Sequence, residues 1–347
     1  MTVISYKKNA CVMGLLWVAG SLHAGLAEDA AVSTERFEPV KPKHIQLPDF
    51  AWDETAQHRE GWVMVSTMVD ADGKPYETAV ESSTGNAVFE RAAVAAIAAA
   101  KLEPARLDGQ PIESVFRVRV LFYSRDSGQR RGGTPEFLKL YGDFGNALKQ
   151  HDQAAAQAIL EQFKITNLYE DAMLGLAQYS YAVQYQDELA QMAGLKRAVA
   201  YEGAGEYLPR NVSLPALRAL FRVQVQARYY GEALDTWEKL QKADHDAQVI
   251  GELKKTAVQV EQLRSDPKAY ATAGALKDGR WYISLFRRHF QLQIAQGHVT
   301  DLKVRCEKTY LSFPYDPQIE YRVEAKSGKC YLEVEGEPGS LVTLIQS

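Results

Sequence analysis

The chain has 347 residues, which is long enough for two or three domains. Its 40 Lys and Arg side chains are nearly balanced by 44 Asp and Glu side chains, which leaves a net charge of -4 at pH 7. Because no basic run interleaved with aromatic residues accompanies this balance, we do not expect nucleic acid or another polyanion as a partner.

The N-terminus has the pattern of a secretory signal peptide. Lys7 and Lys8 precede a largely apolar run over residues 10–26. Residues 25–27 (Gly-Leu-Ala) place small side chains at the two positions that a signal peptidase reads, so we expect residues 1–27 to be removed. The alternative is an uncleaved helix that anchors the chain in a membrane, because a run of about 17 residues is at the lower limit for a span.

Residues 45–123 predict the order strand, strand, helix, strand. The two-residue period over residues 62–69 indicates a strand with a buried valine face, and the turn at residues 70–73 (Asp-Ala-Asp-Gly) leads into a second strand. Asn86 can cap a helix whose apolar and small residues recur at three- and four-residue spacing. The last strand, residues 116–122, alternates apolar residues with arginines, which predicts one core face and one solvated face.

A succession of short motifs accompanies these elements. They are Glu60-Gly61-Trp62-Val63, Asp70-Ala71-Asp72-Gly73, Ser82-Ser83-Thr84-Gly85, an alanine-rich helix, Pro104-Ala105, Gly109-Gln110-Pro111 and Phe116-Arg117-Val118-Arg119-Val120-Leu121-Phe122. This succession resembles the C-terminal domain of the TonB family, the periplasmic energy transducers of Gram-negative envelopes. The resemblance implies a periplasmic chain, with an inner-membrane anchor as the alternative if the N-terminal helix is not cleaved.

The resemblance also implies a binding mode. In TonB-like domains the three-stranded sheet presents an edge to which an extended segment of a partner adds as a strand. We place that edge on the final strand. The candidate partner-binding residues are Val115, Arg117, Arg119, Leu121 and Tyr123. The implied partner is an envelope protein, and contact with the membrane would be indirect. The alternative is that Arg117 and Arg119 only form a solvated face.

Residues 124–134, which contain three arginines and several glycines, predict a flexible linker. The chain from 135 to 263 then predicts paired helices, with breaks near Asp152, Asp187 and Gly231. This pattern resembles tetratricopeptide repeats, which implies a concave groove for an extended peptide or a partner helix. A plain helical bundle that serves as a spacer is the alternative.

Residues 279–347 return to strand patterning and predict about six short antiparallel strands in a small sandwich or curled sheet. Cys306 and Cys330 remain after Cys11 leaves with the signal peptide, so a disulfide between them is the simplest expectation in an oxidising compartment. By the chain-entropy estimate it would contribute about 3 kcal/mol, and we expect it to stabilise only this tail. A metal site would need more ligands close by.

The sequence gives little support to an enzyme. The histidines are scattered without metal-ligand spacing, and neither a glycine-rich phosphate loop nor a Gly-x-Ser-x-Gly elbow occurs. We therefore predict no catalytic residue, no cofactor and no metal. The prediction is an α+β multidomain adaptor protein that contributes to envelope transport or organisation. The alternative function is a helical-repeat assembly factor or chaperone-like scaffold in which the TonB-like domain only docks.

Overall fold

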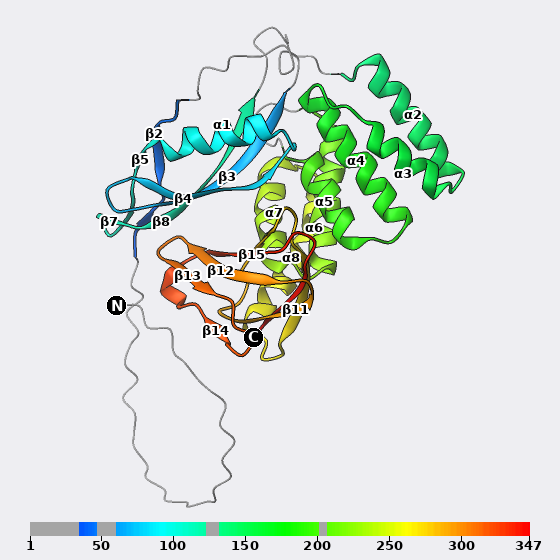
Figure 1. Ribbon diagram of the computed structural model, residues 1–347. Helices are drawn as coiled ribbons and strands as arrows, with labels where there is room; N and C mark the ends of the chain where they lie inside the picture. Colours follow the sequence, from blue (N-terminus) through cyan, green and yellow to red (C-terminus); the bar gives the residue numbers. More distant parts are fainter. Residues whose placement is uncertain (1–34, 47–59, 123–131, 201–206) are drawn as a thin grey trace, which may run out of the picture.

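The computed structural model describes residues 35–46, 60–122, 132–200 and 207–347. The predicted signal peptide, most of the predicted linker and Tyr123 lie outside these ranges. Figure 1 shows a front domain, several helical hairpins beside it, and a C-terminal sandwich of strands that lies against both. In the described ranges no helix is both long enough and apolar enough to cross a membrane.

The front domain contains the predicted strand, strand, helix, strand order. Its main sheet has the order β4-β3-β8 and is antiparallel throughout. The bounds are β3 Gly61–Val69, β4 Pro75–Ser83, α1 Ala87–Ala98 and β8 Ser114–Phe122. Short ladders that the sequence did not predict join β1 Phe37–Glu38, β2 Lys41–His44, β5 Lys101–Glu103, β6 Ala105–Leu107 and β7 Gln110–Ile112.

Helix α1 covers one face of this sheet. Asn86 caps it as predicted, because its side chain accepts the N–H of Val88 at 2.9 Å. Phe89 stacks on Phe122 of β8 with ring centroids 4.5 Å apart, and Ala93 lets the helix lie close to the valines of β3. The buried valine face predicted for the first strand is therefore confirmed.

The opposite face of the sheet is only partly solvated: Arg117 of β8 is exposed, as predicted for this face, but the neighbouring β3 side chains are covered. Trp62 and Ser66, which point away from α1, are only 5% and 1% exposed. The helical region covers Trp62, and the sandwich lies over the middle of the sheet, where Arg117 stacks on Tyr331. A strand with apolar side chains on both faces, as β3 has, is typical of burial on both sides.

The helical region consists of hairpins, and the breaks predicted near Asp152 and Asp187 are present, whereas the third break lies at residues 227–229 and the predicted Gly231 is inside α7. The bounds are α2 Pro135–Lys149, α3 Gln153–Gln162, α4 Leu168–Gln184, α5 Glu188–Ala198, α6 Arg210–Gln226, α7 Tyr230–Ala243 and α8 Ala247–Gln262. The loops of the first three hairpins have the same turn conformation. His151, Gln186 and Arg228 each adopt positive φ there, one in each loop. The residue after each of them donates to a carbonyl in the last turn of the preceding helix, as in a Schellman motif.

The C-terminal sandwich has two four-stranded antiparallel sheets, ordered β10-β15-β12-β13 and β14-β11-β16-β9. The bounds are β9 Tyr270–Ala275, β10 Arg280–Ser284, β11 His289–Gln296, β12 Val299–Cys306, β13 Tyr310–Pro314, β14 Tyr321–Arg322, β15 Cys330–Gly336 and β16 Leu341–Gln346. The predicted sandwich is thus present, but its strands begin before the predicted start at Gly279. β9 pairs along its whole length with β16.

The sandwich does not have a core of its own. Its buried side chains form one cluster with those of α5 to α8, which joins Leu217 and Leu240 of the helices to Leu332 and Leu344 of the strands. Cys306 and Cys330 are bonded, as predicted, and both belong to this cluster. Because this core includes the helices, we expect the disulfide to stabilise the helices together with the tail and not the tail alone.

Candidate functional site

The strand that carries the predicted binding residues lies at an edge of the front sheet. Among the described strands β8 pairs with β3 alone, in a regular antiparallel register from Gly61 opposite Phe122 to Val69 opposite Ser114. The opposite edge of the sheet is β4, which two register shifts make irregular. An edge strand presents a row of backbone donors and acceptors to which another chain can pair.

The hydrogen bonds at the end of β3 show which residues of β8 face outward. Trp62 directs both its N–H and its C=O to Thr84, on the β4 side of the sheet. Backbone groups alternate along a strand, so Gly61 and every second residue after it face β8. The register then directs the backbone groups of Val115, Arg117, Arg119 and Leu121 away from β3.

The side chains of three of these residues, Arg117, Arg119 and Leu121, contact the rest of the molecule. Leu121 packs in the apolar cluster between the front domain and α4, and the Arg119 guanidinium lies 5.5 Å from the Trp62 ring. Arg117 lies 4.0 Å above the ring of Tyr331 in β15 and forms two hydrogen bonds to Glu81 of β4, at 2.7 and 2.6 Å. The predicted residues are thus brought together on one strand, with the exception of Tyr123, which is outside the described ranges.

A buried polar network joins the front domain to the helical region. The Trp62 indole N–H donates to Asp171 Oδ2 of α4 at 3.1 Å, across 109 positions of sequence. The same carboxylate accepts from Arg197 Nε of α5 at 2.7 Å. Close by, Glu60 Oε2 accepts the N–H of Leu168, the first residue of α4, at 3.1 Å. The first turn of α4 is therefore held by the front domain and is not part of an open groove.

A second network joins the front domain to the sandwich. Arg305 of β12 and Glu333 of β15 form a buried ion pair at 2.8 Å, and Arg305 Nη1 also donates to the backbone carbonyl of Glu77 at 2.9 Å. Lys303 Nζ lies 3.0 Å from Glu77 Oε2, and this hydrogen bond holds the pKa of the Glu77 carboxyl below its ordinary value. Tyr282 of β10 donates toward Glu333 at 2.9 Å and lies 3.2 Å from the carbonyl oxygen of Val80.

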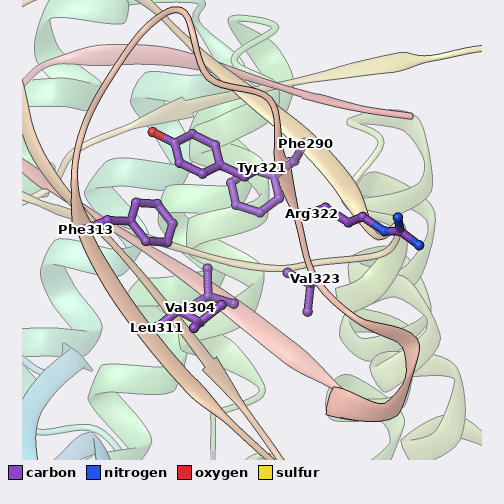
Figure 2. Close-up of a pocket in the computed structure, with 7 residues that line it drawn as sticks. All are labelled: Phe290, Val304, Leu311, Phe313, Tyr321, Arg322 and Val323. Carbon is purple, nitrogen blue, oxygen red and sulfur yellow. The ribbon is translucent and has the colours of Figure 1, made fainter. Parts of the chain in front are cut away.

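Figure 2 shows an apolar cavity inside the sandwich. Phe290, Phe313 and Tyr321 line it from three strands, together with aliphatic side chains. Its volume is about 10 Å³, which is about the space that one water molecule needs. The cavity is therefore a packing defect and not a site for a metabolite.

No group of three or more His, Cys, Asp or Glu side chains in the described ranges is arranged to hold a metal ion.

The side chains that join the parts of the molecule, above all Trp62, Glu77 and Arg305, were not predicted as functional from the sequence. Trp62 and the methionines opposite the valine face of β3 were the available signal for a second buried face.

Comparison with curated proteins finds no match to the chain. No family match covers the helical hairpins, so their resemblance to tetratricopeptide repeats stays a prediction. Residues 48–123 match the family described as Gram-negative bacterial TonB protein C-terminal, so the front domain is of TonB type and indicates a protein-interaction role in the periplasm or envelope.

Proposed function

We propose that the chain is a periplasmic adaptor that binds an extended segment of another envelope protein along the outer edge of β8. The observation that carries the proposal is the side of β8 with which no described strand pairs, in a TonB-type domain, with the backbone groups of Val115, Arg117 and Leu121 directed outward. Pairing at such an edge uses main-chain hydrogen bonds for affinity and needs no reactive side chain. The proposed function is therefore not enzymatic.

The proposed location rests on the N-terminal pattern and on the disulfide. Lys7, Lys8 and the apolar run that follows predict cleavage after Ala27, and a bonded Cys306–Cys330 pair suits an oxidising compartment. N-terminal sequencing of periplasmic material should find a chain that starts near Glu28. Recovery of Met1 in a membrane fraction would instead support an anchored protein.

Proline substitution tests the edge directly. A photo-crosslinking amino acid at Val115 should capture the partner in intact cells, and mass spectrometry of the adduct identifies it. Arg117→Pro removes an outward amide and should abolish this adduct while the domain stays folded, because proline has no N–H to donate. Val118→Pro removes an amide that pairs with β3 and should unfold the domain.

Arg117→Ala is the matched control, since it keeps the amide and loses only the contacts of the guanidinium with Glu81 and Tyr331. We expect it to keep most of the adduct. If Arg117→Pro stays folded by circular dichroism and gives the same adduct as the parent, the outer edge of β8 is not the binding site.

The helical scaffold remains a second candidate function, because three hairpins with the same turn build a regular stack. Leu138 on α2 and Val183 on α4 are large apolar side chains on its surface, at 51% and 46% exposure. If the stack carries the function, Leu138→Ser should lose the partner while Arg117→Pro keeps it. The opposite result supports the edge of β8.

A further inference from the structure

The outer side of the β10-β15-β12-β13 sheet meets the front domain through several side chains, two of which come from the neighbouring strands β12 and β15. Arg305 of β12 donates to the carbonyl of Glu77 at 2.9 Å, and Tyr331 of β15 supports the Arg117 guanidinium at 4.0 Å. Arg305 and Tyr331 lie directly opposite each other in the β12–β15 ladder. One pair of residues in the sandwich therefore contacts both β4 and β8, the two edge strands of the front sheet.

The front domain has a backbone irregularity at the point of contact. Glu77 has φ of +50°, a conformation that residues other than glycine rarely adopt, and it lies where the β3–β4 register shifts between Ser66 and Met68. A bulge of this kind bends a strand and redirects its groups. Here it presents the carbonyl to Arg305 and the carboxylate to Lys303. Such strain persists only where the surroundings hold it in place.

The disulfide is the next pair along the same ladder. Cys306 follows Arg305, Cys330 precedes Tyr331, and the two cysteines are register partners as well as covalently bonded. Both are buried, and they lie where β12 ends and β15 begins. Strand ends fray and can slip in register unless they are held. A covalent bond at this pair keeps Arg305 opposite Tyr331.

We propose that the C-terminal sandwich is an internal docking platform for the TonB-type domain, and that the Cys306–Cys330 bond fixes its two docking residues, Arg305 and Tyr331, in register. These two are positioning residues, since they hold β4 and β8 and do not themselves pair with a partner. The effect of Arg305 and Tyr331 on partner binding rests on the proposed function. A docked front domain presents β8 beside the sandwich, and an undocked front domain does not.

Distance measurements in the full-length chain test the docking. Spin-labelled amino acids at the exposed positions Val88 of α1 and Val258 of α8 report the separation of the front domain from the helices that share the core of the sandwich. The parent should give one narrow distance distribution. A variant with both Cys306→Ala and Cys330→Ala should give a broader distribution with a longer component.

Two single variants keep the disulfide and make the test independent of folding defects. Tyr331→Ala removes the support of Arg117, and Glu77→Gly removes the pair with Lys303 while it relieves the strained φ. Both should broaden the distribution while circular dichroism stays at the parent value. Lys139→Ala, which removes an exposed pair with Asp143 on α2, is the matched control and should leave the distances unchanged.

Unchanged distances in Tyr331→Ala and in Glu77→Gly would overturn the platform, whatever the cysteine variant does. A folded cysteine variant with the parent distances would overturn the role of the bond. The crosslink from Val115 is scored separately in the same variants. If a variant undocks and loses the adduct, the positioning role of Arg305 and Tyr331 in binding is supported. If a variant undocks and keeps the full adduct, that role is refuted. A parent that docks but gives no adduct refutes the proposed function alone.

Discussion

The sandwich has two boundaries of opposite character. Toward the helices it is apolar, and Trp281 of β10 packs edge-on against Tyr229 at the start of α7, with ring centroids 6.3 Å apart, inside one continuous core. Toward the front domain its contacts are mostly charged or polar, as with Lys303 and Glu77 at 3.0 Å, and one aromatic pair, Tyr76 of β4 and Tyr310 of β13, joins them. The first boundary resembles the interior of a domain, and the second resembles a transient interface.

The difference indicates how the molecule divides. Side chains that share one core lose their support together, so helices α5 to α8 and the sandwich should unfold as one unit, which we call the body. Polar contacts exchange readily with water, so the front domain should be able to separate from the sandwich without unfolding the body. We therefore expect the tail, which the sequence suggested as a separate small domain, to fold as part of this larger unit.

The largest effect is expected at the apolar boundary. Trp281→Ala removes a buried indole that contacts Tyr229, and it should destabilise the body by about 3–5 kcal/mol. Chemical denaturation followed at helix and strand wavelengths of circular dichroism should show both signals shift together to lower denaturant. A helix signal that stays at the parent midpoint would show that the core is not shared. Trp281→Phe is the control and should lose much less stability than Trp281→Ala.

A pH effect is expected at the same boundary. Glu232 of α7 accepts the N–H of Ser284 in β10 at 2.9 Å, and burial raises its pKa to about 7 against the opposing charge of Lys196. The folded body then holds a proton that the unfolded chain releases near pH 4.5. Stability from this group is complete below that pH and is lost as the pH rises to about 7, by at most about 3 kcal/mol.

Glu232→Gln keeps an acceptor for Ser284 and cannot ionise, so it should remove this component of the pH dependence. The free energy of unfolding, measured by urea titration at several pH values, should differ between parent and variant mainly above pH 7. Glu252→Gln on the exposed side of α8 is the control. Parallel curves for the parent and Glu232→Gln would contradict the assignment.

Local features were predictable from the sequence because local chemistry decides them. Asn86, Asp152 and Asp187 cap helices at the predicted breaks, since their side chains accept the first N–H groups. The turns before α3 and α5 contain no glycine: His151 and Gln186 take the positive φ there. The periodicity of the helices was therefore a better guide to these breaks than a search for glycine.

The features that were missed depend on distant contacts. Alternation in β8 predicts two faces but does not say what covers each one, so the arginine face was expected to meet solvent. Its cover includes Tyr331, and the bond from Trp62 to Asp171 spans 109 positions. β9 was missed for a local reason, because its Ala-Thr-Ala-Gly-Ala pattern lacks the bulky residues that mark a strand.

A substitution at the junction of the front domain with α4 should lower the stability by an amount between those expected at the apolar and the charged boundaries of the sandwich. Trp62→Phe keeps an aromatic ring in the apolar cluster but removes the donor to Asp171, a fully buried carboxylate. Loss of one donor to a buried charged group costs about 1–3 kcal/mol. Thermal unfolding by circular dichroism measures it. A variant as stable as the parent would show that Asp171 is satisfied without the indole.

The smallest effect is expected at the charged boundary. Lys303 is mostly covered but Glu77 is 40% exposed, and a pair of this kind contributes about 0.2–1 kcal/mol. Lys303→Ala should therefore raise the undocked population by less than about fivefold in the spin-label experiment.

A change of salt concentration tests whether these charged contacts set the docking equilibrium, since exposed charges are screened over about 10 Å at 0.1 M and about 3 Å at 1 M. The parent should undock further between about 0.1 and about 1 M NaCl, and Lys303→Ala should respond less. Trp62→Phe acts at the apolar junction, so it should keep the full salt response of the parent. If Lys303→Ala responds to salt as strongly as the parent, the charged contacts do not set the docking equilibrium, and the apolar cluster around Trp62 does.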